Sequence, residues 1–133
     1  MIVRDLMQRN LVTVASDATI AEAVTALVEA HVSALPVLDR LGRAVGVISA
    51  REILEAERAR PEPAARERLF DETLVLEVMQ AWPATVAPQA EVHAATERML
   101  GLGVQRLFVE DGGALVGVIS LTDIARAFAL AAA

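Results

Sequence analysis

A serine followed three positions later by an acidic residue occurs twice, each time directly after the run Gly-Val-Ile: Ser49 with Glu52, and Ser120 with Asp123. A serine hydroxyl that opens a helix lies beside unpaired backbone amides at the positive end of the helix dipole, where anions bind. An ionised carboxylate only accepts hydrogen bonds, and its two oxygens suit two neighbouring hydroxyl donors. Each pair is therefore a candidate site for a ligand with an anionic group and hydroxyls.

The same spacing also has a purely structural explanation. In a capping box, a serine and an acidic residue three positions later satisfy unpaired amides at the start of a helix. On spacing alone we favour this cap over a ligand site for both pairs.

The chain is acidic, with a formal net charge of −6, and all twelve of its basic residues are Arg. An anionic ligand then needs a local positive group. Arg106, just before the apolar run Leu107-Phe108-Val109, is such a group, and Arg51 beside Glu52 is a second.

Several kinds of chemistry are excluded because the chain has no Lys, Cys or Tyr. A phosphate-binding lysine loop, a Schiff base, a thiolate nucleophile and a cysteine zinc site all need missing residues. His31 and His93 are far apart in the sequence, without an obvious third metal ligand. We expect no enzymatic activity, no metal and no required cofactor.

The charge and the apolar pattern also restrict partners and location. An acidic chain without basic runs is a poor general nucleic-acid binder. No apolar run approaches the length that spans a membrane, and the sequence does not start like a secretory signal. We expect a cytoplasmic protein that binds neither membrane nor nucleic acid.

The elements that must position these residues come from an internal duplication. Moving back 71 positions carries Gly117 onto Gly46 and Ser120 onto Ser49. Moving back 72 carries Thr85-Val86 onto Thr13-Val14. Each copy alone is small enough to be marginally stable, so we expect the two copies to pack on one another. The predicted organisation is repeat 1 over 1–57, a partly helical and solvated linker over 58–73, and repeat 2 over 74–133.

Within each copy the pattern predicts a short strand, a helix, two strands and a second helix. In the first copy, Thr19 and Glu22 predict the start of an amphipathic helix, and His31 is expected to end it. The strands 34–38 and 44–48 follow, and Pro36 indicates an edge or a strand start because it cannot donate a hydrogen bond. Residues 2–12 carry apolar residues at helical intervals. The result is a small sheet with helices on one face.

These features together resemble the cystathionine-β-synthase-type domain, or CBS domain. They are Thr-Val before a helix, the strand Ala34-Leu35-Pro36-Val37 followed by Asp39, and Gly-Val-Ile-Ser-x-x-Asp/Glu before an apolar helix. The resemblance covers nearly the whole chain and implies an α/β (α+β) fold of tandem β-α-β-β-α repeats packed about a pseudo-twofold axis. Such a pair is called a Bateman module, and it implies a homodimer.

The resemblance also implies an adenosine-type ligand: AMP, ADP, ATP or S-adenosylmethionine. It assigns adenine to the Thr-Val strand, phosphate to the serine and the basic residue, and the ribose hydroxyls to the acidic residue. The implied nucleotide-binding set is Thr85, Val86, Arg106, Leu107, Ser120 and Asp123. A weaker second set is Thr13, Val14, Ser49, Arg51 and Glu52.

The two sets are expected to differ in strength. Glu52 is one methylene longer than Asp123, so both the cap and the ligand role remain open for it, whereas the resemblance favours ribose binding for Asp123. Ala34 stands where the second copy has Arg106. Phe108 replaces the proline found in the first copy, and its ring is expected to alter the start of the strand or to fill the cleft.

We therefore expect a stand-alone regulatory module that senses an adenine nucleotide and passes its occupancy to a partner protein or through its dimer surface. The alternative is a ligand-free dimerisation or scaffold module. The apolar composition and the presence of Glu52 and Phe108 favour this alternative.

Overall fold

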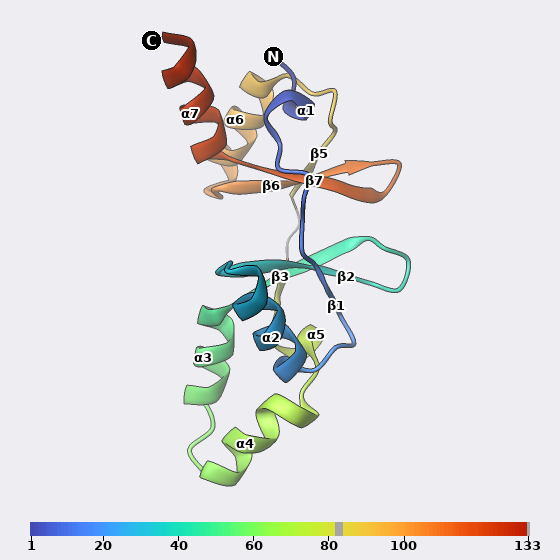
Figure 1. Ribbon diagram of the computed structural model, residues 1–133, viewed down its shortest axis with the longest axis vertical. Coiled ribbons are helices and arrows are strands. Elements are labelled where there is room, and N and C mark those ends of the chain that lie inside the picture. Colours follow the sequence, from blue (N-terminus) through green and yellow to red (C-terminus); the bar gives the residue numbers. More distant parts are fainter. Residues whose placement is uncertain (82–83, 133) are drawn as a thin grey trace. The chain divides into compact units, whose positions relative to one another are not determined.

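The computed structural model describes residues 1–81 and 84–132, and the chain divides into two compact units (Figure 1). The middle unit is Val12–Pro83. The terminal unit combines Met1–Leu11 with Ala84–Ala133. The compact units therefore differ from the sequence repeats, because residues 1–11 belong with the second repeat.

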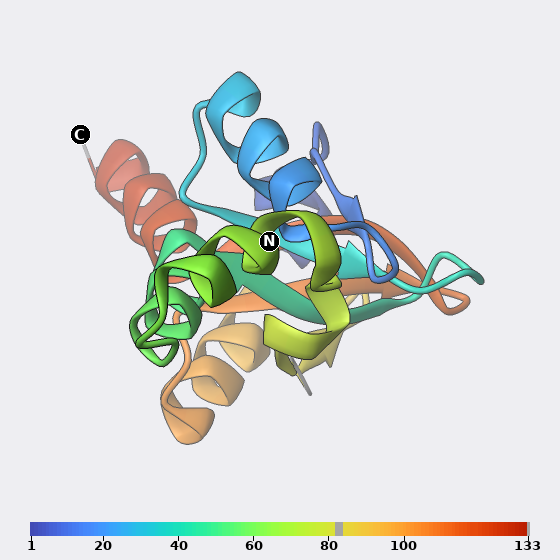
Figure 2. The ribbon, with the colours of Figure 1, turned by 90° about the horizontal axis from the view of Figure 1, so that it is seen from below.

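The middle unit has a sheet of four strands in the order β1-β2-β3-β4. Its strands are β1 (Val14–Ala15), β2 (Ala34–Leu38), β3 (Ala44–Ser49) and β4 (Gln80–Ala81). β1 runs parallel to β2, and the other pairs are antiparallel. Helices cover one face of this sheet, as Figure 2 shows from the helix side: α2 (Ile20–Ala30), α3 (Ala50–Arg58), α4 (Pro63–Glu72) and α5 (Val75–Val78).

The terminal unit has a sheet of three strands in the order β5-β6-β7. Its strands are β5 (Thr85–Val86), β6 (Arg106–Asp111) and β7 (Ala114–Ser120). β5 and β6 are parallel, and β6 and β7 form an antiparallel hairpin. Three helices belong to this unit: α1 (Val3–Leu6), α6 (Val92–Leu102) and α7 (Leu121–Ala132). The mixed α/β architecture predicted from the sequence is confirmed.

Each unit has its own apolar core between the sheet and the helices. Alternate residues of a strand point to opposite faces, so one residue in two enters the core. In the middle unit Leu35, Val37 and Ile48 are fully buried in this way. Leu107, Val109 and Ile119 do the same in the terminal unit.

No helix within residues 1–81 and 84–132 is long and apolar enough to cross a membrane.

The ends of α2 follow the sequence prediction. The Thr19 hydroxyl accepts a hydrogen bond from the Glu22 amide at 3.2 Å, which caps the start of the helix. His31 ends the helix with a left-handed backbone, φ 54°. Gly103 ends α6 in the same conformation, φ 68°. The prediction that His31 ends the helix is confirmed.

Three local expectations need correction. The helical segment within 2–12 is only Val3–Leu6, because the chain is extended again at Met7. The linker is not simply solvated, since Leu69 of α4 is 1% exposed and belongs to the core of the middle unit. Pro36 lies in an internal strand rather than at an edge. It is tolerated because β1 starts only opposite Val37.

In each unit, one extended segment crosses a strand of the sheet and pairs with it. The sequence did not predict these two crossing segments. Gln8 pairs with Val118 of β7, and Gln80 pairs with Val47 of β3. The preceding methionines lie against glycines of the same strands. A Cβ atom on Gly117 would stand 2.7 Å from the Met7 sulfur and 2.9 Å from the Gln8 carbonyl oxygen. A side chain at this position is therefore incompatible with the crossing.

We predict that Gly117→Ala destabilises the protein by about 1–3 kcal/mol, because the added methyl group must displace backbone as well as a side chain. Gly101→Ala is the matched control. Gly101 lies in α6 with open space where its Cβ would be, so alanine should be neutral or stabilise by up to about 1 kcal/mol. Urea unfolding of the two variants measures both values. Equal stability of the two variants would contradict the packing described for Gly117.

Candidate functional site

In the terminal unit, strand register brings half of the six predicted ligand residues onto one face of the sheet. Arg106 lies directly opposite Ser120, Phe108 lies opposite Val118, and Thr85 is the partner of Phe108. Residues that oppose each other in neighbouring strands share a face. The face that carries Thr85, Arg106 and Ser120 is therefore opposite to the helix-covered face.

Two predicted ligand residues point the other way. Leu107 is fully buried in the core of the terminal unit, and Val86 packs against that core. Their side chains are therefore occupied by packing. Any ligand contact from these two positions is limited to their backbone N–H and C=O groups.

Asp123 closes a reciprocal capping box with Ser120. The Ser120 amide donates to Asp123 Oδ2 at 3.1 Å, and the Asp123 amide donates to the Ser120 hydroxyl oxygen at 3.1 Å. The Asp123 side chain is 10% exposed. The structural explanation of this Ser-x-x-Asp spacing thus holds, and one carboxylate oxygen is committed to the start of α7.

Within residues 1–81 and 84–131, the neighbours of the other oxygen of Asp123 are side chains. Gln8 Nε2 donates to Oδ1 at 3.3 Å, and Arg126 Nη1 lies 3.7 Å from the same oxygen. Gln8 is not among the ligand residues predicted from the sequence. Its only sequence signal is that Met7-Gln8 is repeated 72 positions later as Met79-Gln80.

Phe108 does not distort its strand. Its amide donates to the Ala84 carbonyl at 3.3 Å, a bond that the equivalent Pro36 cannot make. The side chain is 2% exposed, although it lies on the face away from the helices. The expected change at the start of the strand is therefore wrong, since Phe108 pairs as an ordinary strand residue.

The middle unit carries the second predicted set in a different arrangement. Both the Ser49 amide and the Ser49 hydroxyl donate to Glu52 Oε1, at 3.1 and 2.8 Å. The longer Glu52 side chain thus takes the serine hydroxyl as a donor, whereas in the terminal unit the hydroxyl is an acceptor. Ala34 lies opposite Ser49, so this sheet face lacks the counterpart of Arg106.

Arg51 is the cation predicted for this second set, and its side chain is turned to solvent. Its Nε forms a salt bridge of 3.0 Å with Glu55, and the two side chains are 83% and 63% exposed. The hydrogen bond and the negative charge of Glu55 raise the pKa of Arg51 above its usual value. The side chain is charged but already paired within α3.

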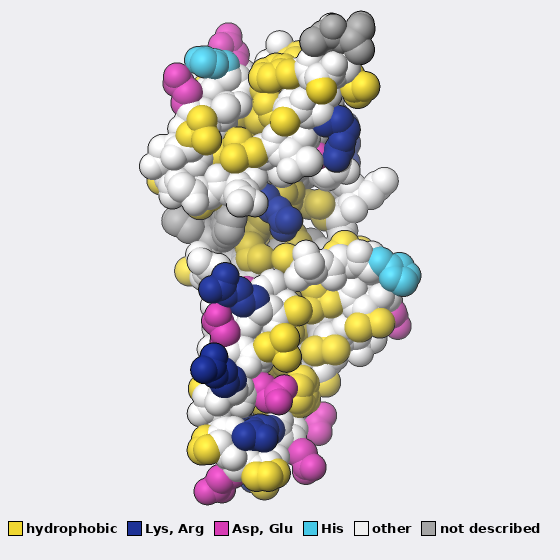
Figure 3. All heavy atoms as spheres, turned by 90° about the vertical axis from the view of Figure 1, so that its left-hand side faces the viewer, with side chains coloured by type: hydrophobic (Ala, Val, Ile, Leu, Met, Phe, Trp, Pro, Cys, Tyr) yellow, Lys and Arg dark blue, Asp and Glu magenta, His cyan; other side chains and the backbone are white. Residues whose placement is uncertain are grey.

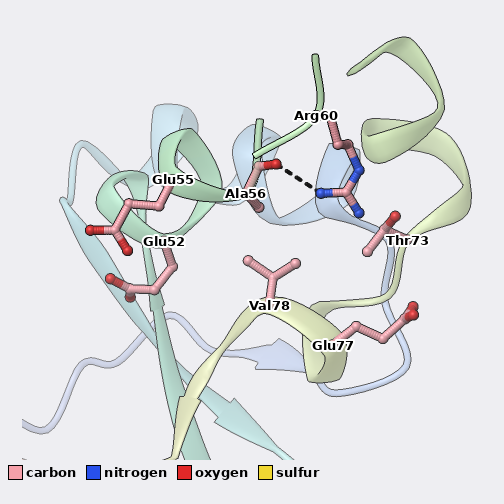
Figure 4. A pocket seen from close by; sticks show the side chains of 7 residues that line it. All are labelled: Glu52, Glu55, Ala56, Arg60, Thr73, Glu77 and Val78. Carbon is pink, nitrogen blue, oxygen red and sulfur yellow. Dashed lines mark hydrogen bonds between the residues drawn. The ribbon is translucent and has the colours of Figure 1, made fainter. Parts of the chain in front are cut away.

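A pocket of about 410 Å³ in the middle unit lies between α3 and the segment that contains α5 (Figure 4). Arg60 lines it and donates through Nη1 to the Ala56 carbonyl at 2.8 Å, and three glutamates also line it: Glu52, Glu55 and Glu77. A second pocket of about 410 Å³ lies in the terminal unit, lined by Met1, Ile2, Glu91, Val92, His93 and Phe128. Of the predicted ligand residues, only Glu52 lines either of these two pockets.

Within residues 1–81 and 84–132, no three His, Cys, Asp or Glu side chains are grouped to hold a metal ion. His93 is paired with Glu97 on α6 at 3.3 Å, and both side chains are exposed.

We predict that Asp123→Ala destabilises the protein by about 1 kcal/mol, because the Ser120 amide loses its acceptor at the start of α7. Thr122→Ala is the control, since Thr122 is exposed and has no cap bond. Thermal or urea unfolding of both variants provides the measurement. Unchanged stability in Asp123→Ala would mean that the capping box does not hold the helix.

Comparisons with known proteins agree with this fold and with the duplication. The family model for the CBS domain matches the chain twice, over residues 3–59 and 75–130. An A-adding tRNA nucleotidyltransferase from Aquifex aeolicus is 30% identical over 125 residues, which are 94% of this chain. The chain spans only 14% of the length of that relative.

Solved structures extend the similarity to three dimensions. The CBS domain of a CBS domain-containing membrane protein from Sphaerobacter thermophilus has a TM-score of 0.79 at 25% identity, covering 95% of this chain and 86% of that one. The protein CBSX2, solved in complex with AMP, has a TM-score of 0.77 at 26% identity. That match covers 99% of this chain and 98% of CBSX2.

Proposed function

Because this chain belongs to the CBS domain family and carries two copies of the domain, we propose that it is a regulatory module that binds an adenosine-type ligand. The single observation that carries the proposal is the register of β6 and β7, which sets the exposed Arg106 directly opposite Ser120 at the start of α7. A cation beside a helix start is a suitable place for a phosphate. The similarity to CBSX2, solved with AMP, supports adenosine-type ligands.

In this proposal the terminal unit provides the stronger site. Arg106 and Ser120 bind the phosphate, Thr85 and the backbone of Val86 and Leu107 contact the adenine, and Asp123 binds ribose. The capping box allows this role for Asp123, since it commits Oδ2 to the Ser120 amide and leaves Oδ1 to exchangeable side-chain partners. No catalytic step is part of the proposal.

The middle unit is the weaker site for physical reasons. Thr13, Val14 and Ser49 repeat the pattern, but Ala34 replaces the arginine that would face the phosphate. Arg51 must break its salt bridge with Glu55 before it can bind an anion. Glu52 Oε1 also accepts from the Ser49 hydroxyl, so that hydroxyl must break this bond before it can donate to a phosphate.

We predict that Arg106→Gln weakens AMP binding about tenfold and leaves adenosine binding unchanged, because only AMP carries the phosphate that the guanidinium contacts. Isothermal titration calorimetry with AMP, ATP, S-adenosylmethionine and adenosine measures these affinities. The matched control is Arg98→Gln, an exposed arginine of α6 in the same unit.

The titrations also test the proposal as a whole. Failure of the wild-type protein to bind any of the four compounds at millimolar concentration would remove the ligand-binding function. An equal loss of AMP affinity in Arg98→Gln and Arg106→Gln would assign the effect to overall charge rather than to a phosphate contact.

We also propose that the module forms a homodimer through the terminal unit and regulates a partner protein. Exposed apolar side chains lie on α6 and α7: Leu100, Leu102, Phe128 and Leu130. Figure 3 shows hydrophobic side chains at the surface of one face of the molecule. Contiguous exposed apolar patches of this kind mark association surfaces.

Leu100→Glu and Phe128→Glu should each shift the dimer toward monomer by at least tenfold in dissociation constant, since a charge must then be buried in an apolar contact. Leu41→Glu is the control, because Leu41 is 77% exposed in the β2–β3 turn of the middle unit. Sedimentation velocity at several concentrations measures the shift. An unchanged dimer in both α6 and α7 variants would place the interface elsewhere.

The second candidate function is a ligand-free scaffold. Two observations favour it: Asp123 and Glu52 are both engaged in hydrogen bonds to their own serines, and Phe108 is buried on the sheet face that would receive the ligand. A dimer that forms normally and binds none of the four compounds would support the scaffold.

A further inference from the structure

The side chain of Gln8 occupies the carboxylate oxygen that a ribose would need. Gln8 Nε2 donates to Asp123 Oδ1 at 3.3 Å, whereas Oδ2 is held by the Ser120 amide at 3.1 Å. Oδ2 supports the start of α7, whereas the neighbours of Oδ1 are the side chains of Gln8 and, at 3.7 Å, Arg126, which a ligand hydroxyl can replace without loss of the helix cap.

The hydrogen bond from Gln8 to Asp123 is exposed and long, so it is easily broken. The residue is exposed, and 3.3 Å is long for an N–H···O hydrogen bond. Its backbone is fixed independently, since the Gln8 amide donates to the Val118 carbonyl at 2.8 Å and the Val118 amide donates to the Gln8 carbonyl at 3.1 Å. The side chain can therefore rotate away from Asp123 while the crossing segment stays paired with β7.

We propose that Gln8 is an internal competitor for the ligand: its amide donates to Asp123 Oδ1 in the free protein and is replaced there when a ribose hydroxyl binds. This inference rests on the proposed function of the terminal unit. It adds a specificity-determining residue from outside the second repeat. Breaking the bond between Gln8 and Asp123 costs free energy and therefore lowers the apparent affinity of the site for its ligand. Gln8 thus raises the ligand concentration that is needed to fill the site.

The middle unit offers an internal comparison. Gln80 is the counterpart of Gln8 and pairs with Val47 just as Gln8 pairs with Val118. Among the residues that the structure describes, however, the hydrogen bonds to the Glu52 carboxylate come from Ser49, and Gln80 makes none to it. The competitor is thus a property of the terminal unit alone, and Gln80 provides a matched control.

The test is a calorimetric titration of the full chain with AMP, using the wild-type protein and three variants. Gln8→Ala and Gln8→Asn both remove the bond, the second because its side chain is one methylene shorter. Each should lower the dissociation constant for AMP about three- to tenfold, the range expected when a hydrogen bond of about 1 kcal/mol no longer has to be broken. Gln80→Ala should leave the affinity unchanged.

A second readout follows the side chain itself. In the wild-type protein, the side-chain NH₂ resonances of Gln8 should move toward solvent-exposed values as AMP is added. Tighter binding in both Gln8 variants, together with this shift, supports the inference. Weaker or unchanged binding in the Gln8 variants, with AMP still bound by the wild type, overturns the competitor and leaves the proposed function intact. Absence of binding in the wild type and in all variants overturns both.

Discussion

Within each unit, the fold depends on a methionine-glutamine segment that crosses a strand at a glycine. Met7-Gln8 lies over Gly117 of β7, and Met79-Gln80 lies over Gly46 of β3, with distances that exclude a Cβ atom on either glycine. Each crossing is also paired with its strand through backbone hydrogen bonds. Short helices next to the crossings then bury Val3 and Val75 in the cores. A side chain in place of either glycine would have to displace the segment that crosses it.

The crossing also brings chemistry to the candidate site. Gln8 is far from Asp123 in the sequence, and its backbone pairing with Val118 places its amide beside the carboxylate. Ser120 and Asp123 are held by their own capping box, so the local sequence determines only half of the environment of Asp123. The other half comes from a segment that precedes the first repeat's strands. The surroundings of Asp123 in the terminal unit therefore combine a segment near the start of the sequence with the start of α7.

The capping boxes show how one motif can serve two purposes. In the terminal unit, the short Asp123 side chain divides its oxygens between its own backbone and external donors. In the middle unit, the longer Glu52 receives both donors of Ser49 on a single oxygen, and its pocket holds two further glutamates. A difference of one methylene group thus accompanies two different hydrogen-bond arrangements of the same motif. Similar sequence positions in a duplicated chain need not have the same function.

The sequence by itself determined the duplication, the elements of each copy, the cap at Thr19 and the helix end at His31, because these depend on residue types over a few neighbouring positions. It also predicted the family. Only the tertiary structure decided that residues 1–11 complete the second repeat, that Leu69 of the linker enters a core, and that Leu107 faces inward while Arg106 faces Ser120. Register and long-range pairing set these features. A single sequence encodes such contacts through complementary surfaces rather than through any local pattern, which is why the contact of Gln8 with Asp123 became visible only in the folded chain.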